Sequence, residues 1–512
     1  MQTFFDETLD ISIQTNMSYD AKLYEYNFKA ALAKIQQIES GAIANATAVP
    51  SESENRPVDH YNLRMKEEKV AGKSLAKTVE QWQLVKKFAE ANMHKFKHVV
   101  FNGIGGSYLG PYMLIQAING DEFNSVQQKE NRPSLHFVAN TDSDSFTQLF
   151  TQIDINETLM VVISKSGATA ETATNTQIFS ELLKDKAPQH MAAITIPGSN
   201  LHKKAANWLA TFEMNESTGG RTSIGSAVAM VPCAFANIDF EQFANGMCQM
   251  DEATRRPNNN PAFFISALID QFLQKSAGPR NMIILGYADS LKHYYHYCQQ
   301  LYMESLGKQY THDGRFSPRG LTVYGGIGTA EQHAFMQQIQ KGVQDSFVKF
   351  IQFNKRRFQD YKDEKAGTMG RQLLAFLKGT EAALDQNGRQ FMTVSAKECS
   401  PFCIGQLIAL EERIVTVLAA FWDLNAYDQP GVQDGKLAAG KVNKTSIQLD
   451  KLLVPVENLN AEQIMKKLDM NDNAQLITDL LNDMVFNPAS YTNGLKGERK
   501  FVDGQFVFTF RK

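Results

Sequence analysis

The pattern of apolar positions changes about a hundred residues into the chain. Before that point apolar residues recur with the period of a helix, which predicts helices over Tyr24–Glu39 and Ser74–His94. Between them, Ala42–Pro57 is rich in Ala, Ser, Asn and Pro, so we expect a loop there. Residues 1–95 therefore read as a mostly helical N-terminal segment.

Beyond residue 95, short β-rich runs alternate with amphipathic stretches. Helices are expected after Gly106 and over Glu171–Lys184. The strands between them are expected at His98–Phe101, Leu135–Ala139, Leu159–Ile163 and Ala192–Ile196. Near-continuous apolar strands that alternate with helices are typical of a parallel sheet covered on both faces. We therefore expect a first doubly wound domain over residues 96–240.

The same alternation restarts after a plausible crossing segment, Phe240–Pro261. Predicted strands are Asn281–Leu285, Leu321–Tyr324 and Phe347–Phe353, and predicted helices are Ser290–Leu306, Thr329–Gly342, Gly370–Ala383 and Ile404–Trp422. Residues 241–440 should form a second doubly wound domain. The tail, residues 441–512, mixes helical patterning with an alternating end, Lys500–Arg511, and we expect it to wrap another part of the molecule or a second subunit. The predicted fold class is α/β, with two doubly wound parallel sheets.

Length and composition agree with this division. A chain of 512 residues is too long for one compact core, and 43% hydrophobic with 21% charged residues is a normal globular mix. The net charge of −3 creates no long-range field for nucleic acid or an anionic membrane. The acidic start, MQTFFDETLD, is not a signal peptide, and the longest apolar stretches fall short of the ~20 residues that span a bilayer. The five cysteines form no CxxC pair, so we expect reduced thiols, no metal site and a cytoplasmic protein.

Ligands of open α/β sheets lie beyond the carboxyl ends of the strands, so the loops there are where chemistry is expected. The first such loop, FNGIGGSYLGP, carries Gly106 and Ser107. Its glycines allow a tight turn and close approach of a ligand, although a simple strand–helix turn needs them too. The loop is not GxGxxG with a following acidic ribose partner, which disfavours a dinucleotide site.

The second loop, ISKSGATAET, follows a predicted strand directly and leads into a helix. Capping that helix requires one hydroxyl, whereas this loop has four and a lysine: Ser164, Lys165, Ser166, Thr169 and Thr172. Hydroxyl donors beside the free N–H groups of a helix N-terminus favour a phosphate site. The loop is not a P-loop, because GxxxxGK[ST] is absent.

Four further segments place polar residues in turns or near helix ends. They carry Gly220 and Arg221, then Glu304, then Gln332 and His333, and finally Gln429 and Lys436 on what we read as a polar loop after a helix. Taken singly, they are explained better by an exposed arginine, an exposed helical glutamate, a structural histidine and a solvated loop. Their order along the chain is more informative than any one of them.

In that order, six segments resemble the successive motifs of the glucose-6-phosphate isomerase family. They are GGSYLGP, SKSGAT.ET, GGRTS, MES.GK, GT.EQHAF and FWD.N.YDQPGV..GK. The resemblance covers residues 101–436. It implies a metal-free and cofactor-free aldose–ketose isomerase acting on a hexose 6-phosphate, and a homodimer in which His333 enters the partner's active site.

The resemblance also implies a role for each candidate residue. Glu304 corresponds to the base that moves a proton between C2 and C1, and Arg221 to the group that steadies the enediolate. His333 and Lys436 correspond to the ring-opening residues. The phosphate site is implied at Ser164, Lys165, Ser166, Thr169 and Thr172, and other substrate contacts at Gly106, Ser107, Gly220 and Gln429.

Two other classes of function stay open at this point. A non-catalytic sugar-phosphate-binding regulator of the same fold would keep the hydroxyl-rich loop but would not need Glu304, His333 and Lys436 together. A dual isomerase that also accepts mannose 6-phosphate would keep all of these residues.

Overall fold

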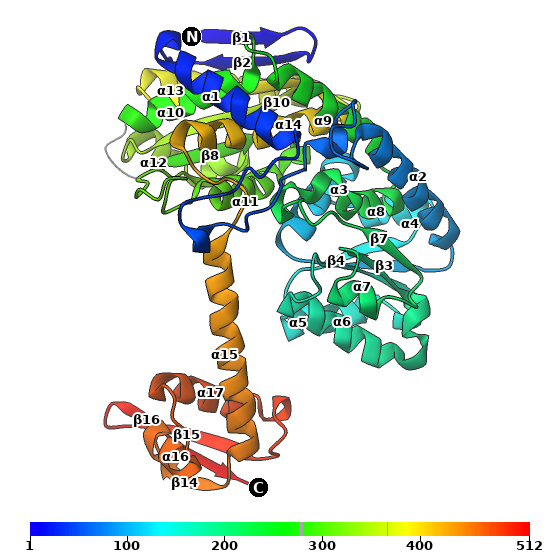
Figure 1. Ribbon diagram of the computed structural model, residues 1–512, viewed down its shortest axis with the longest axis vertical. Coiled ribbons are helices and arrows are strands. Elements are labelled where there is room, and N and C mark those ends of the chain that lie inside the picture. The colour runs from blue at the N-terminus through cyan, green and yellow to red at the C-terminus, as the bar shows by residue number, and fades with distance from the viewer. Residues whose placement is uncertain (276–279, 366) are drawn as a thin grey trace. The chain divides into compact units, whose positions relative to one another are not determined.

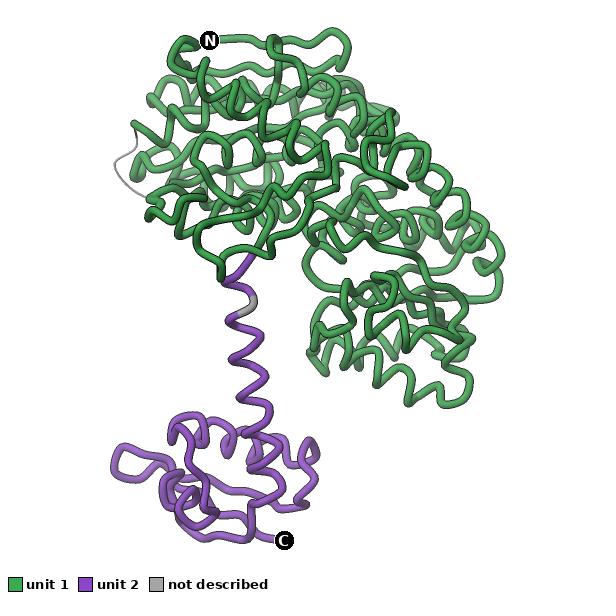
Figure 2. The backbone as a smooth tube through the Cα atoms, viewed as in Figure 1, with its two compact units in different colours: residues 1–428 green, residues 429–512 purple. Residues whose placement is uncertain are grey.

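The computed structural model describes residues 1–275, 280–365 and 367–512, with Gln433 described by its backbone alone. The chain forms two compact units, Met1–Asp428 and Gln429–Lys512 (Figure 2). The boundary between the units lies twelve positions before the one expected at residue 440.

The first sheet of the larger unit has five parallel strands in the order β4-β3-β5-β6-β7. Of these, β3, β4 and β7 are labelled in Figure 1. Their bounds are β3 His98–Asn102, β4 Ser134–Val138, β5 Thr158–Ile163, β6 Met191–Thr195 and β7 Ala210–Glu213. Every residue of β5 is buried, and its side chains alternate between two separate apolar clusters. The sheet is therefore covered on both faces, as the continuous apolar strands predicted.

The second sheet has the order β1-β2-β13-β10-β8-β9. Four of its strands are parallel, β8 Asn281–Gly286, β9 Thr322–Ile327, β10 Ser346–Lys355 and β13 Gln390–Glu398. An antiparallel hairpin of β1 Gln2–Asp6 and β2 Ile11–Thr15 pairs with β13, so the helical reading of residues 1–95 omitted two strands. Residues 11, 13 and 15 are buried and alternate with partly exposed ones, which is the period of a strand.

The two sheets share one strand order. In each, the second parallel strand in the sequence, β4 or β9, lies on one side of the first, and the third, β5 or β10, lies on the other side. The order therefore reverses between β3 and β5, and again between β8 and β10. The doubled α/β architecture predicted from the sequence is confirmed.

Most predicted helices are present within a few residues of their expected bounds. The helices of the larger unit are α1 Ala21–Glu39, α2 Leu75–Asn92, α3 Leu109–Asn119, α4 Phe123–Lys129, α5 Ser143–Gln152, α6 Ala170–Leu183, α7 Asn200–Lys204, α8 Ala227–Phe235, α9 Phe240–Thr254, α10 Pro261–Lys275, α11 Tyr294–Leu306, α12 Met336–Lys341, α13 Met369–Gln386 and α14 Pro401–Trp422. The predicted crossing segment is mainly α9, which packs closely on the buried α14: a Cβ on Gly405 would lie 2.1 Å from the Phe243 carbonyl oxygen.

The smaller unit has its own core, which includes Leu449, Ile464, Ile477, Leu481 and Phe508. Its elements are α15 Pro430–Leu452, β14 Val456–Leu459, α16 Ala461–Leu468, α17 Ala474–Phe486, β15 Lys496–Val502 and β16 Gln505–Arg511, with an antiparallel sheet in the order β14-β16-β15.

These elements correct one reading of the C-terminal region and confirm another. The predicted polar loop carrying Lys436 is wrong, because this residue lies in α15, which starts with Pro430 at a first-turn position. The expected alternation at Lys500–Arg511 is confirmed as strand structure. The independent core was not expected from the sequence.

Candidate active site

The two candidate groups at the centre of the site come from different halves of the larger unit. Arg221 lies on the 3₁₀ turn η6 (Gly220–Gly225) after β7, and Glu304 lies near the end of α11. The Nη1 atom of Arg221 is 3.2 Å from Oε2 of Glu304. The arginine side chain is 2% exposed, whereas the glutamate side chain is 26% exposed. The pair therefore combines a fixed cation with a carboxylate that a ligand can reach.

Arg221 is held by more than Glu304. Its Nε donates to Oγ of Ser305 at 2.7 Å, and its Nη2 donates to the carbonyl oxygen of Ala426. Burial lowers the pKa of Arg221 from its usual value, and the charge of Glu304 opposes this effect. A guanidinium stays protonated in proteins, so these bonds fix both the position of a positive charge and its orientation.

Glu304 is positioned by the helix that carries it. Its Oε1 accepts a hydrogen bond from Nε2 of Gln300, one turn earlier, at 3.2 Å. The neighbouring tyrosines of α11 turn inward instead: Tyr294 and Tyr302 donate to the buried Glu411 of α14 at 2.8 and 2.6 Å. Nζ of Lys349 completes this cluster at 2.6 Å from Glu411. A buried ionic cluster thus anchors the helix of the candidate base.

Two glycine-rich turns meet beside Arg221. Gly106 and Ser107 lie on the 3₁₀ turn η3 (Gly105–Ser107) after β3, and Gly220 lies on η6. A Cβ on Gly106 would be 1.8 Å from the Gly220 carbonyl oxygen, so only glycine permits this contact. The structure therefore brings together the two turns that carry Gly106, Ser107, Gly220 and Arg221.

The hydroxyl-rich segment, residues 164–172, forms the turn between β5 and α6 and is called the phosphate loop below. The backbone N–H of Gly167 donates to Oγ of Ser164, and that of Ala168 donates to Oγ of Ser166, both at 3.1 Å. Among the described residues, neither hydroxyl donates a hydrogen bond, so the hydrogen of each can be offered to a ligand. Thr169 is the N-cap of α6 but makes no side-chain capping bond. The loop therefore presents donors at a helix N-terminus.

The remaining members of the loop differ in exposure. Thr172 is buried in the first turn of α6, and Ser166 is exposed. Lys165 is partly buried, and burial together with the nearby charge of Arg56 lowers the pKa of its ammonium group.

Three of the predicted residues belong to other elements. His333 ends the 3₁₀ turn η8 (Ala330–His333) and is exposed, and no side-chain hydrogen bond within the described ranges involves it. Gln429 and Lys436 belong to the smaller unit, at the N-cap and within α15. Of the three, only His333 therefore belongs to the larger unit.

Sequence reasoning missed Lys308, although it is the last letter of the segment MES.GK. Its Nζ donates to the carbonyl oxygens of Glu304 and Ser305, the latter at 3.1 Å, and the residue is 8% exposed. Burial and the charge of Arg221 lower the pKa of Lys308 to about 7. A lysine one turn after a glutamate usually lies at the helix surface, so local sequence gave no sign of this environment.

A reachable carboxylate, a fixed guanidinium and a phosphate-type loop are together suited to proton abstraction next to a carbonyl of a phosphorylated substrate. The sequence model of the family described as phosphoglucose isomerase matches residues 31–453 of the chain. The chain belongs to the phosphoglucose isomerase family. Membership confirms the resemblance seen in the six motifs and identifies the chain as an aldose–ketose isomerase.

Individual relatives agree with the family assignment. The chain is 34% identical to a glucose-6-phosphate isomerase of a Geobacter species over 94% of this chain and 93% of that protein. It is 36% identical to the one of Trichormus variabilis over 90% and 88%. Among solved structures, a glucose-6-phosphate isomerase from Chlamydia trachomatis aligns with a TM-score of 0.75 at 26% identity, over 85% of this chain and 88% of that one. Among the described residues, no helix is long and apolar enough to cross a membrane.

Proposed function

We propose that this chain catalyses the reversible isomerisation of glucose 6-phosphate and fructose 6-phosphate. The observation that carries the proposal is the 3.2 Å pair of Arg221 and Glu304. A base on one face of the substrate moves the proton between C2 and C1, and a fixed positive charge holds the enediolate that forms in between. The names of the relatives support this choice of substrate.

The other residues complete the reaction in this proposal. The closed sugar ring opens by proton transfer through His333 and Lys436. The phosphate loop, with Ser164, Lys165, Ser166, Thr169 and Thr172, binds the part of the substrate that does not react and so orients the part that does. Gly106, Ser107, Gly220 and Gln429 contact the sugar.

We also propose a homodimer in which His333 of each chain enters the partner's active site. The exposure of His333 in a single chain supports this arrangement. A two-fold dimer makes the exchange reciprocal. The enzyme would act in glycolysis and gluconeogenesis in the cytoplasm, where the five buried thiols would remain reduced.

Replacing Glu304 by Gln tests the assignment of the base. The change keeps the shape of the side chain and removes its basicity, so kcat should fall by about 10²–10⁴ while sugar phosphate still binds. Exchange of the C2 proton with solvent should stop as well. Glu80→Gln, on the exposed face of α2, is the matched control and should be fully active. Near-normal turnover of Glu304→Gln would reject the role, and a wild-type protein that binds sugar phosphate without turnover would indicate a regulator.

Co-expression of Glu304→Gln with His333→Ala tests the shared site. Random pairing makes about half of the dimers mixed, and each mixed dimer then has one doubly altered and one intact site. About a quarter of the wild-type activity should therefore return. If each chain used its own His333, every site would carry one change. Mixed dimers confirmed by mass spectrometry but no more active than either parent would exclude the exchange.

A further inference from the structure

The second sheet has a strand-order reversal that the proposed reaction does not use. It lies between β8 and β10, at the position that corresponds to the β3–β5 reversal of the first sheet. Open α/β sheets bind ligands beyond the carboxyl ends of their strands at such a reversal. In the first sheet the phosphate loop follows the third parallel strand, β5. Its counterpart in the second sheet is the segment that follows β10.

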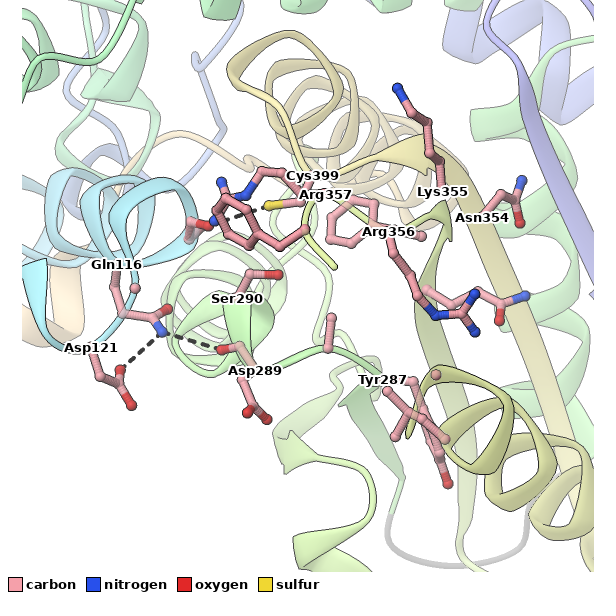
Figure 3. A pocket seen from close by; sticks show the side chains of 18 of the residues that line it. Gln116, Asp121, Tyr287, Asp289, Ser290, Asn354, Lys355, Arg356, Arg357 and Cys399 are labelled. Carbon is pink, nitrogen blue, oxygen red and sulfur yellow. Dashed lines mark hydrogen bonds between the residues drawn. The ribbon is translucent and has the colours of Figure 1, made fainter. Parts of the chain in front are cut away.

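A cavity of about 690 Å³ opens at this reversal (Figure 3). Its walls include residues 287–290 after β8, residues 352–358 from the end of β10 and the loop beyond, and Cys399 after β13. The ends of α3 and α13 complete it. The volume is that of a small-molecule site, and no residue of the candidate active site lines it.

Three successive cations, Lys355, Arg356 and Arg357, line this cavity. Lys355 pairs with Glu398 at 2.7 Å, and Arg356 pairs with Asp360 at 3.3 Å. Arg357 forms no ion pair with any described carboxylate; its guanidinium lies 4.6 Å from the centre of the Phe358 ring and beside Cys399 (Figure 3). The forked N–H groups of an arginine match the oxygens of a phosphate, so Arg357 has its charge available for an anion.

Two carboxylates, Asp121 and Asp289, also line the cavity. Gln116, Asp121 and Asp289 lie on the side away from Lys355 and Arg356 (Figure 3). Asp121 is already bound by Nζ of Lys292 at 2.7 Å and by Nε2 of Gln116 at 3.0 Å. Asp289 forms no ion pair with a described cation. Such carboxylates repel a bare anion but accept hydrogen bonds from hydroxyl groups.

We propose that this cavity is a second ligand site, which binds a phosphorylated polyol with its phosphate on Arg357 and its hydroxyl groups toward Asp289. The site is separate from the Arg221–Glu304 pair and takes no part in the proton transfer. In this proposal, the segment after β10 recognises a phosphate in the second sheet, and its position corresponds to that of the phosphate loop after β5 in the first sheet.

Calorimetric titration of the full chain with glycerol 3-phosphate tests the proposal. The titration uses a Ser166→Ala/Thr169→Ala background, which weakens binding at the phosphate loop. We expect a binding event that Arg357→Gln weakens about tenfold or more, the loss of a charge-assisted hydrogen bond. Arg511→Gln, an exposed arginine of the smaller unit, is the charge-matched control and should have no effect. Arg357→Gln in an otherwise wild-type chain should keep full isomerase activity, which shows that the fold is intact.

Absence of binding in the background, or an affinity and stoichiometry that Arg357→Gln leaves unchanged, would overturn the proposal. A second titration with inorganic phosphate tests the acidic wall. Inorganic phosphate should bind more weakly than glycerol 3-phosphate, and Asp289→Asn should reduce that difference. Equal affinity for the two probes would overturn the placement of the hydroxyl groups.

Discussion

At the scale of single residues, the site depends on unequal exposure of two opposite charges. Arg221 is nearly fully buried and bonded to Ser305 and Ala426, whereas Glu304 is reachable from solvent. A preorganised charge of this kind needs no reorganisation when negative charge develops on a substrate. The motifs predicted both residues, because each stands in a short segment typical of the family. They could not predict the burial of Lys308, which depends on side chains far away in the sequence.

Arg221→Lys tests the orientation of this charge. A lysine keeps the charge but cannot make the forked bonds to Glu304, Ser305 and Ala426. We expect kcat to fall by roughly 10²–10³, the usual cost of one lost stabilising donor, with a smaller change in KM. Steady-state kinetics measures both. Arg315→Lys, at an exposed position, is the control, and equal activity of both variants would contradict a role for orientation.

The buried ammonium group of Lys308 should make the stability of the folded chain depend on pH. Its pKa is lowered to about 7 in the folded chain, so between pH 7 and its ordinary value of 10.5 the unfolded chain binds more protons than the folded one. Stability contributed by this group therefore rises with pH through that window. We expect Tm of Lys308→Met to lack part of the rise that the wild type shows from pH 7 to pH 9.

The control for this comparison is Lys129→Met, an exposed lysine of α4. Its Tm curve should run parallel to that of the wild type. If the curve of Lys308→Met also ran parallel, the ammonium group of Lys308 would be exposed to water or charged throughout, contrary to its buried position.

At the scale of elements, the helix of Glu304 depends on an ionic cluster beneath it. Tyr294, Tyr302 and Lys349 all bond to the buried Glu411. Removing one member of a buried ion pair leaves an unpaired charge, which costs about 3–5 kcal/mol. We therefore expect Glu411→Gln to lower the free energy of unfolding by that amount, measured by denaturant titration, and to lower kcat as α11 loosens.

A double change separates the charge from the packing. Glu411→Leu with Lys349→Met removes both charges, so it should cost less than Glu411→Gln alone. Glu80→Gln should change stability by less than about 0.5 kcal/mol, as exposed sites usually do. A Glu411→Gln variant as stable as the wild type would show that the cluster does not hold the helix.

The elements themselves were predicted where their periodicity is long or their strands are continuously apolar. The helices α1, α2, α13 and α14 and the strands β3, β5 and β8 show this. The hairpin β1–β2 was missed because each strand has five residues, too few for alternation to stand out. The N-terminal half of α15 was read as a loop because it has no apolar face.

At the scale of the whole molecule, the N-terminal half of α15 has side chains that are buried by no other part of the single chain that the structure describes. Every described side chain from residue 431 to residue 444 is exposed in the single chain, among them Leu437 at 61%. Helices without packing are marginal in water. We expect the proposed dimer to cover this segment, so its amides should exchange slowly with deuterium at concentrations where the chain is dimeric.

Dilution below the dimer dissociation constant, with mass checked by sedimentation, should speed this exchange. The core of the smaller unit, around Leu449 and Ile477, should remain protected and serves as an internal control. Exchange in residues 431–444 as fast as in a free peptide at dimeric concentration would contradict coverage by a partner.

The repeated strand order of the two sheets also bears on ancestry. Two halves with one topology, joined by α9 and α10, have the form that duplication of a single ancestral domain leaves behind. Arg221 comes from the earlier half and Glu304 from the later one. Neither ancestral copy alone would have held both charges in one chain. The fusion then brought the two charges into one chain, and a gene split between α9 and α10 would separate Arg221 from Glu304 and would also remove the β1–β2 hairpin from the second sheet.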